Sequence, residues 1–210
     1  MSTSSFLSFA SLVISAGLLI GCGSGGQERR TDTAKTSAAV SVDVTKAKQD
    51  LDGVLSELKN LRDASDTADL KKMQGDLRKK SSQLTDSVTS VVNSSDSAVT
   101  AGKAQNEAWR KQADAFTEAD LRNASQKRQG DLRSAVDELA VANTALKTER
   151  DTYVSQLNQL VSALDLDLTQ LGVQAIKPTL NKLVDNEPKM RQTLTDVAVK
   201  SRSVNTVINP

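Results

Sequence analysis

Residues 132–171 read LRSAVDELAVANTALKTERDTYVSQLNQLVSALDLDLTQL, and this stretch decides the fold. Its apolar residues recur at steps of three, four or seven, the spacing that lines one face of an α-helix. They are Leu132, Val136, Leu139, Leu146, Tyr153, Leu157, Leu160, Leu164, Leu168 and Leu171. The spacing predicts one helix from about residue 118 to residue 171, with Gly172 as its C-terminal cap. At a rise of about 1.5 Å per residue, this helix would be ~80 Å long.

Three further segments carry the same spacing of apolar residues. They span residues 44–61, 70–116 and 176–208, and the middle segment is the richest in small and polar residues. The polar run at residues 63–67 interrupts the pattern and predicts a turn near residues 62–66. Together the segments predict an all-α fold: an elongated antiparallel helical bundle, or coiled coil, of three to four helices over residues 41–208.

The distribution of proline supports long helices. No proline occurs between residues 27 and 177, and proline costs ~3 kcal/mol in a helix interior. In the last segment, Pro178 is compatible with the first turn of a helix, whereas Pro188 is expected to kink or break it.

Two signals mark the start of the longest predicted helix. Thr117-Glu118-Ala119-Asp120 resembles a capping box, in which the Thr hydroxyl accepts the amide three residues on and the Asp reaches back. Phe116 and Leu121 then occupy the two positions of a hydrophobic staple. Both signals predict a helix that begins at Thr117, directly after a turn.

Two glycines lie at nearly equal distances from this turn. If the flanking segments fold back on each other, Gly102 and Gly130 lie at about the same height. Glycine inside a helix costs about 1 kcal/mol, so two at one level suggest that the helix backbones approach closely. The alternative, equally favoured, is that both glycines are tolerated on exposed faces.

The amino-acid composition argues against several classes of function. The chain of 210 residues has no His and one Cys, so it lacks the Ser-His-Asp and Cys-His catalytic sets, imidazole metal ligands and an intramolecular disulfide. A net charge of +1 gives no general attraction to nucleic acid. Aromatic residues make up only 2%, which disfavours aromatic-lined pockets. We therefore expect no enzyme activity, no metal or cofactor, no nucleic-acid partner and no small-molecule substrate.

The first residues of the chain resemble a bacterial lipoprotein signal peptide. Residues 1–21 contain no charged side chain, although such signals usually carry Lys or Arg near their start. Residues 6–20 are apolar or small, and Leu19-Ile20-Gly21-Cys22 resembles a lipobox. This resemblance implies cleavage before Cys22 and attachment of lipid to its thiol. The alternative, an uncleaved anchor, is less favoured because this apolar run rises only ~22 Å, short of the ~30 Å hydrocarbon core.

The residues after the lipobox favour a particular layout in the envelope. Residues 22–40 are rich in Gly, Ser, Thr and Ala, and they predict a disordered, flexible tether between the lipid and the bundle. Gly23 follows the cysteine where some lipoproteins carry Asp. By resemblance to known sorting rules, this favours the outer membrane, facing the periplasm, in a host with two membranes.

Four side chains are candidates for contact with a partner: Trp109, Phe116, Leu121 and Leu166. Trp109 lies near the predicted turn, where packing beneath the turn is favoured over anchoring a partner. Leu166 falls outside the apolar stripe, and coverage by the last segment is favoured over an exposed patch.

Two charged motifs are weaker candidates. Asp165 and Asp167 are two residues apart, so they point in different directions from a helix, which favours solvated side chains over a catalytic acid pair. The basic residues between positions 71 and 80 have Asp76 among them. This mixture favours an ordinary solvated helix face over a surface for lipid head groups or polyanions.

One family shares several of these features. The likeness lies in Asp69-Leu70, Trp109, Phe116, Leu121-Arg122, Leu157-Asn158, Leu160, Leu171 and Ala175-Ile176. On these residues the chain resembles the bacterial lipoproteins grouped as domain of unknown function 2959. It departs from them at residues 168–172, where the family's turn is more basic and richer in Asn. The resemblance implies a location and an architecture, and no chemistry.

The sequence therefore predicts a membrane-anchored envelope lipoprotein that acts as a non-enzymatic coiled-coil scaffold, spacer or protein-interaction module. The alternative is a helical component of an envelope transport or secretion assembly that docks through the ends of the bundle. Besides the membrane, other envelope proteins or a second copy of the chain are candidate partners. The oligomeric state is left open, because the seams could be satisfied within one chain or between two.

Overall fold

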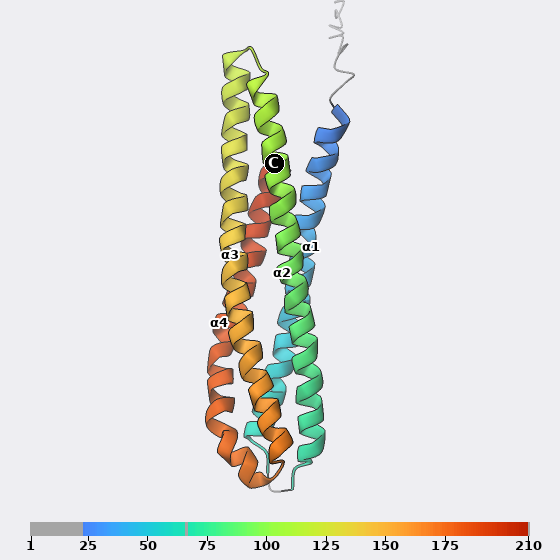
Figure 1. Cartoon of the computed structure of the whole chain (residues 1–210), viewed down its shortest axis with the longest axis vertical. Helices are drawn as coiled ribbons and strands as arrows, with labels where there is room; N and C mark the ends of the chain where they lie inside the picture. Colours follow the sequence, from blue (N-terminus) through green and yellow to red (C-terminus); the bar gives the residue numbers. More distant parts are fainter. Residues whose placement is uncertain (1–22, 66, 210) are drawn as a thin grey trace, which may run out of the picture.

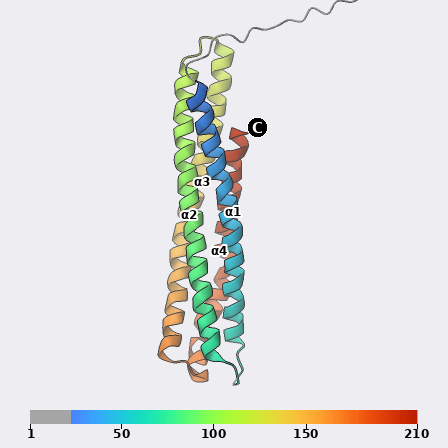
Figure 2. The same ribbon diagram turned by 90° about the vertical axis from the view of Figure 1, so that its right-hand side faces the viewer.

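The computed structural model describes residues 23–65 and 67–209, which form four long helices (Figure 1). These are α1 (Gly23–Arg62), α2 (Leu70–Asp114), α3 (Ala119–Leu166) and α4 (Gln170–Ile208). Successive helices run in opposite directions (Figures 1 and 2). The α1–α2 and α3–α4 turns therefore lie at one end, which we call the two-turn end, and the α2–α3 turn lies at the other. The predicted all-α antiparallel bundle is confirmed, with four helices.

Each helix packs mainly against two neighbours. α1 and α3 each lie beside both α2 and α4, and no contact joins α1 to α3 within the described residues. The four helices thus enclose one core that follows the length of the rod. This is the arrangement expected when short turns join antiparallel helices in chain order.

The predicted apolar seams face this core. The seam of α1 is buried at Val44, Ala47, Leu51, Val54, Leu58 and Leu61. In α3 the predicted set is buried from Leu132 to Leu164. The seam positions of α2 change in size along the rod: Leu77 and Leu84 lie towards the two-turn end, whereas Ser95 and Gly102 lie towards the other.

The helical part of the chain begins earlier than the sequence predicts. A flexible tether is expected over residues 22–40, yet α1 already begins at Gly23. Thr33, Ser37 and Val40 are at most 1% exposed, and they continue the seam of α1 at steps of three and four. Small polar side chains thus occupy core positions in the helical frame. The tether prediction is wrong for the described part of this range, and Cys22 lies outside the described residues.

The end of α3 also differs from the prediction. α3 ends at Leu166 instead of residue 171, and Gly172 lies in the first turn of α4, where its amide donates to Thr169 Oγ1 at 3.1 Å. A Cβ atom on Gly172 would lie 2.3 Å from the carbonyl oxygen of Asp167. Glycine therefore permits a tight turn before the helix continues, and Leu171 is 81% exposed instead of lying in the seam.

The start of α3 does not use the predicted capping box. Glu118, not Thr117, is the N-cap residue, and its side chain makes no cap hydrogen bond. Instead, the Arg122 guanidinium donates to the carbonyl oxygen of Phe116 through Nε at 3.0 Å and through Nη2 at 2.6 Å. This two-point, charge-assisted contact fixes the turn more strongly than a neutral hydroxyl would. With the cap displaced by one residue, Phe116 and Leu121 no longer occupy the staple positions, and both are exposed.

Both prolines of the last segment lie inside α4, which is continuous. Pro188 does not break the helix. It lies between Leu183 and Met190, which are fully buried, and packing on both sides holds the helix across the missing hydrogen bond. Pro178 lies beyond the first turn, because α4 begins earlier than expected.

The two glycines near the α2–α3 turn have different surroundings. A Cβ atom on Gly102 would lie 2.5 Å from Cγ2 of Val136, whereas a Cβ on Gly130 would have nothing within 4 Å. Gly102 is buried and Gly130 is exposed. Of the two predicted alternatives, close packing of α2 against α3 therefore applies at Gly102. Gly130 lies on an exposed face, where a glycine is tolerated.

Candidate functional site

The α2–α3 hairpin extends beyond the end of α4. Lys200 Nζ pairs with Glu138 Oε2 at 2.8 Å, so Ile208 at the end of α4 lies level with about residue 130 of α3. On α2 the same level is marked by Asn106, whose amide donates to the Gln129 carbonyl at 2.6 Å. We call residues 106–130 the hairpin tip. Figures 1 and 2 show it at the same end of the rod as the start of α1.

Three of the candidate contact residues lie in the hairpin tip. Trp109 is half-buried against the core, and the Arg128 guanidinium carbon lies 5.1 Å from the centroid of its ring. Phe116 in the turn is 38% exposed, and Leu121 in the first turn of α3 is 57% exposed. Trp109 therefore packs within the tip, while Phe116 and Leu121 offer apolar surface at its extremity.

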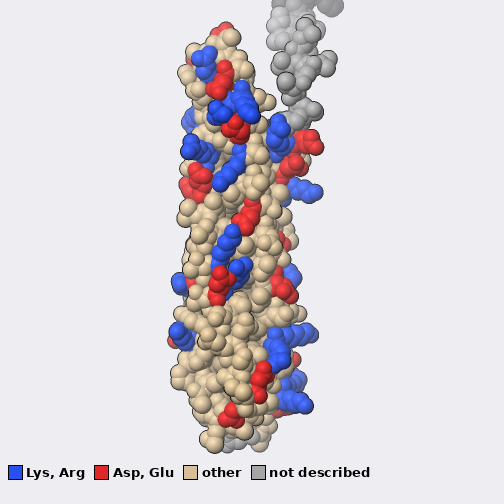
Figure 3. Space-filling view, viewed as in Figure 1, with Lys and Arg blue, Asp and Glu red and all other residues tan. Residues whose placement is uncertain are grey.

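Charged side chains surround these apolar groups. Figure 3 shows Lys and Arg gathered near this end of the visible face, beside acidic residues. Arg110 Nη2 pairs with Glu107 Oε1 at 2.8 Å. Its hydrogen bond lowers the pKa of Glu107, and the same contact raises the pKa of Arg110. Arg110 and Glu107 thus neutralise each other on the surface of the tip.

The two-turn end carries a second group of exposed apolar side chains. Leu166, the last residue of α3, is 90% exposed, and Leu171 in the first turn of α4 is 81% exposed. The favoured coverage of Leu166 by the last segment is wrong. Because α3 ends at Leu166 and the chain turns within residues 167–169, α4 starts too late to cover it.

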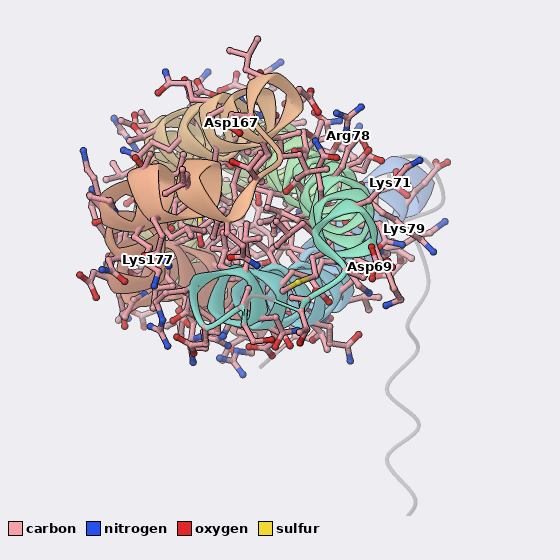
Figure 4. All side chains as sticks on the ribbon, turned by 90° about the horizontal axis from the view of Figure 1, so that it is seen from below. Asp69, Lys71, Arg78, Lys79, Asp167 and Lys177 are labelled. Carbon is pink, nitrogen blue, oxygen red and sulfur yellow. The ribbon has the colours of Figure 1, made fainter. Side chains whose placement is uncertain are left out.

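Charged and polar contacts fix the turns at this end (Figure 4). Asp165 accepts Gln74 Nε2 at 2.6 Å and pairs with Arg78, whereas Asp167 accepts the Thr169 hydroxyl at 2.6 Å. Gln170 Nε2 donates to the Ser65 carbonyl at 2.6 Å and so joins the two turns. The two aspartates bind different partners and do not form an acid pair.

Three of the five basic residues between positions 71 and 80 are engaged locally. Lys72 Nζ pairs with Asp76 Oδ2 at 3.0 Å, and Arg78 pairs with Asp165. The side chain of Lys80 lies over Gly53 of α1, where a Cβ would be 3.2 Å from Lys80 Cδ. These contacts are those of an ordinary helix face that also holds α2 to its neighbours.

A shallow groove runs between α2 and α3 towards the two-turn end. Its lining is mostly uncharged and ends at Leu166; it includes Thr85, Thr89, Val154, Asn158, Ser162 and Leu166. Residues 152–164 of α3 contain no charged side chain. Arg150 and Asp151, which also line the groove, pair with each other at 2.7 Å. The groove is therefore a weakly charged strip that leads to an exposed leucine.

A polar layer, buried at Glu149 and Glu187 and exposed at Lys189 and Asp52, joins α3, α4 and α1 near the middle of the rod. Glu149 Oε2 lies 2.5 Å from Lys189 Nζ, and Glu187 Oε1 accepts Arg191 Nε at 2.5 Å. Arg191 also pairs with Asp52 of α1. The hydroxyl of Tyr153 donates to the Leu183 carbonyl at 3.3 Å, and burial, aided by the charge of Glu187, raises its pKa. Each carboxylate has a cationic partner, so the layer clamps three helices together.

The sequence prediction missed these buried polar residues, although a signal for them exists. Asn143 of α3, which is also buried, lies between Leu139 and Leu146 at steps of four and three, and Glu187 lies between Leu183 and Met190 in the same way. Counting the heptad frame through polar positions would have placed both in the core. A prediction that uses apolar residues alone assigns no core residue at these two positions.

Within residues 23–65 and 67–209, no helix combines the length and hydropathy needed to cross a membrane. The same residues contain no cluster of three or more acidic or cysteine side chains placed to hold a metal ion. No protein-family model, no curated protein and no solved structure matches the chain.

Proposed function

We propose that this protein is a lipoprotein of the bacterial envelope that serves as a non-enzymatic scaffold, spacer or protein-interaction module. In this proposal the acyl chains on Cys22 anchor the rod to a membrane, and the outer membrane is favoured because Gly23 follows the cysteine.

One observation carries this proposal: the residue expected to bear the lipid directly precedes the first helix of a long rod. Cys22 is followed by Gly23, where α1 begins. A lipid at this position would hold one end of the bundle at the membrane, while α3, with 48 residues, would extend ~70 Å from it. A rod of this length suits a spacer or a docking platform.

Lipid attachment can be tested directly in cells. We expect the wild-type chain to incorporate labelled palmitate, and globomycin, which blocks cleavage of lipoprotein signals, to make the precursor accumulate. Cys22→Ala should abolish the label, while Ser24→Ala serves as a control that should keep it. Palmitate incorporation by Cys22→Ala, or unchanged mobility of the wild type in globomycin, would argue against lipid anchoring at this residue.

A second candidate function, a component of an envelope transport or secretion assembly, is favoured by the two-turn end. Leu166 and Leu171 are almost fully exposed there, and the weakly charged groove leads to Leu166. Exposed leucines at the end of a rod are suited to docking on a partner protein.

Site-specific crosslinking in intact cells separates this function from a passive spacer. A photocrosslinker at Leu166 should capture one partner in stoichiometric amount. The control position is Val141, which is 72% exposed on the side of the rod. Equal yields from the two positions, or no product from either, would argue against docking through this end.

A further inference from the structure

We propose that the hairpin tip rests on the surface of the membrane that holds Cys22, with Phe116 and Leu121 in the head-group layer. This inference rests on the lipid anchoring proposed above, and it adds a second, non-covalent contact between the rod and the bilayer. The occupant of the exposed apolar surface at the tip is thus a lipid surface.

The hairpin tip lies at the same end of the rod as the start of α1 (Figures 1 and 2). The Ser201 hydroxyl donates to the Ser37 carbonyl at 2.7 Å, and the neighbouring Lys200 pairs with Glu138. Gly102 packs against Val136, so Ser37 and Gly102 lie at about the same height in the rod. Gly23 is 14 residues from Ser37 along α1, and Phe116 is 14 residues from Gly102 along the chain. Each of these stretches rises ~20 Å towards the same end of the rod. The start of α1 and the tip therefore lie at the same end of the rod, and the tip extends beyond the first turn of α1 (Figures 1 and 2).

The first helix begins directly after Cys22, the expected site of the lipid. Cys22 and Gly23 are adjacent in sequence, so their Cα atoms are about 3.8 Å apart. A flexible tether would have allowed the tip to stand far from the bilayer. Because α1 begins at Gly23, acyl chains on Cys22 would bring the tip to the bilayer surface.

The extremity of the tip also carries exposed apolar side chains. Phe116 and Leu121 are exposed at the end of the molecule, and Arg122 holds the Phe116 carbonyl, which fixes the turn. Arg110 and Lys111, one to two turns below, both pair with Glu107, and the acidic Glu118 and Asp120 lie beside the turn, so the apolar pair and not basic charge carries this contact. Two apolar side chains are too few to bind a bilayer alone, but the anchor makes their contact intramolecular. The contact would then orient the rod and direct Leu166 away from the membrane.

A fluorescence experiment on the lipidated protein in vesicles tests this orientation. The chain has one Trp, so Trp109→Phe gives a dark background for a reporter. Phe116→Trp places the reporter at the tip, and Leu166→Trp places it at the two-turn end as the control. Both proteins are reconstituted into phosphatidylcholine–phosphatidylglycerol vesicles with or without bromine on the acyl chains. If the Trp109→Phe background loses helicity, Leu121→Cys and Leu171→Cys carrying an environment-sensitive dye replace the reporters.

We expect brominated lipid to quench the tip reporter roughly twofold and to leave the control reporter unchanged, because only the tip would reach the interface. An unquenched tip reporter, or equal quenching of both reporters as for a rod lying flat, would overturn the inference. The mass of the purified protein reports lipid on Cys22 separately. Lipidated protein with an unquenched tip would therefore refute the tip contact and leave the proposed function standing, whereas protein without lipid would refute the anchor.

Discussion

The two halves of the bundle are built from different core side chains. We call the half next to the two-turn end the leucine half; it comprises residues 48–62, 70–88, 150–166 and 170–187. The other half, which carries the hairpin tip, is the small-residue half; it comprises residues 27–47, 89–114, 119–146 and 190–208. The buried leucines of the leucine half include Leu51, Leu58, Leu77, Leu84, Leu157, Leu160, Leu180 and Leu183. The small-residue half also buries leucines, on α3 and α4, but its seams in addition include Thr33, Ser37, Ser95, Ala98, Gly102, Gln105 and Ser201.

This difference separates two ways of holding helices together. Burying a leucine side chain contributes about 1.5–3 kcal/mol, whereas a serine or glycine contributes little apolar surface. Small residues instead let helices approach closely, as Gly102 does against Val136. We infer that the leucine half supplies most of the stability, and that the small-residue half opens first when the protein unfolds.

The largest expected effect comes from matched truncations of leucine in α3. Leu157 and Leu132 are both fully buried, one in each half. Leu157→Ala should lower the free energy of unfolding by about 3–5 kcal/mol, and Leu132→Ala by about 2 kcal/mol, because the buried α2 positions near its level are Gly102 and Gln105 and not leucines. Urea denaturation followed by circular dichroism measures both. Leu171→Ala, on an exposed side chain, is the control, and equal losses at Leu157 and Leu132 would contradict the comparison.

The next effect is on alkaline stability and concerns Tyr153 in the leucine half. Burial raises the pKa of Tyr153, so the folded protein favours the neutral phenol. The stability from this group is complete below the ordinary tyrosine pKa of about 10, and it is lost as the pH rises above that value. Each further pH unit removes about 1.4 kcal/mol until the folded pKa is reached.

The chain has one tyrosine, so phenolate absorbance reports this group alone. We expect the absorbance to rise together with the loss of helicity, and Tyr153→Phe to move the alkaline transition to higher pH. Ionisation near the ordinary pKa while the helices remain intact would show that the phenol is reached by solvent in the folded bundle.

Most of the fold could be predicted from the sequence, because apolar residues at heptad spacing specify long helices wherever the core is made of leucine. The seam from Leu132 to Leu164 was predicted and is buried. Where core positions are polar, prediction from apolar spacing fails. Thr33 and Ser37 are buried in α1, although the composition of the surrounding segment is typical of a flexible tether. The helix ends were missed because side-chain contacts across the turns decide them, as the Arg122 contact with the Phe116 carbonyl does at the α2–α3 turn.

Of the candidate site, the residues could be predicted but their exposure could not. Trp109, Phe116 and Leu121 were placed at the α2–α3 turn from the sequence, and the structure brings them together in the hairpin tip. Exposure of Leu166 depended on where α3 ends, which is set by the tight turn at Gly172. No local pattern in the sequence distinguishes that turn from the predicted helix end.

A smaller effect is expected from adding a methyl group to each glycine near the α2–α3 turn. Gly102→Ala should lower stability by about 1–3 kcal/mol, because its Cβ would overlap Val136 and overpack the core. Gly130→Ala should raise stability by about 1 kcal/mol, since the site is open and alanine favours the helix. Thermal unfolding compares the two. The double variant Gly102→Ala/Val136→Ala should be less destabilised than the two single changes together, and strict additivity would show that the two residues do not touch.

The smallest effect concerns Gln105, which is fully buried in the small-residue half. Neither its amide nitrogen nor its amide oxygen has a hydrogen-bond partner among the described residues. Leaving buried polar groups unpaired is costly, so Gln105→Leu, which keeps the volume and makes the position resemble the leucine half, should raise stability by about 1 kcal/mol. Gln112→Leu, on an exposed position of α2, is the control and should change stability little. A loss of stability in Gln105→Leu would mean that the glutamine is held in the folded protein, so that the small-residue half is specified by polar contacts and not only by close approach.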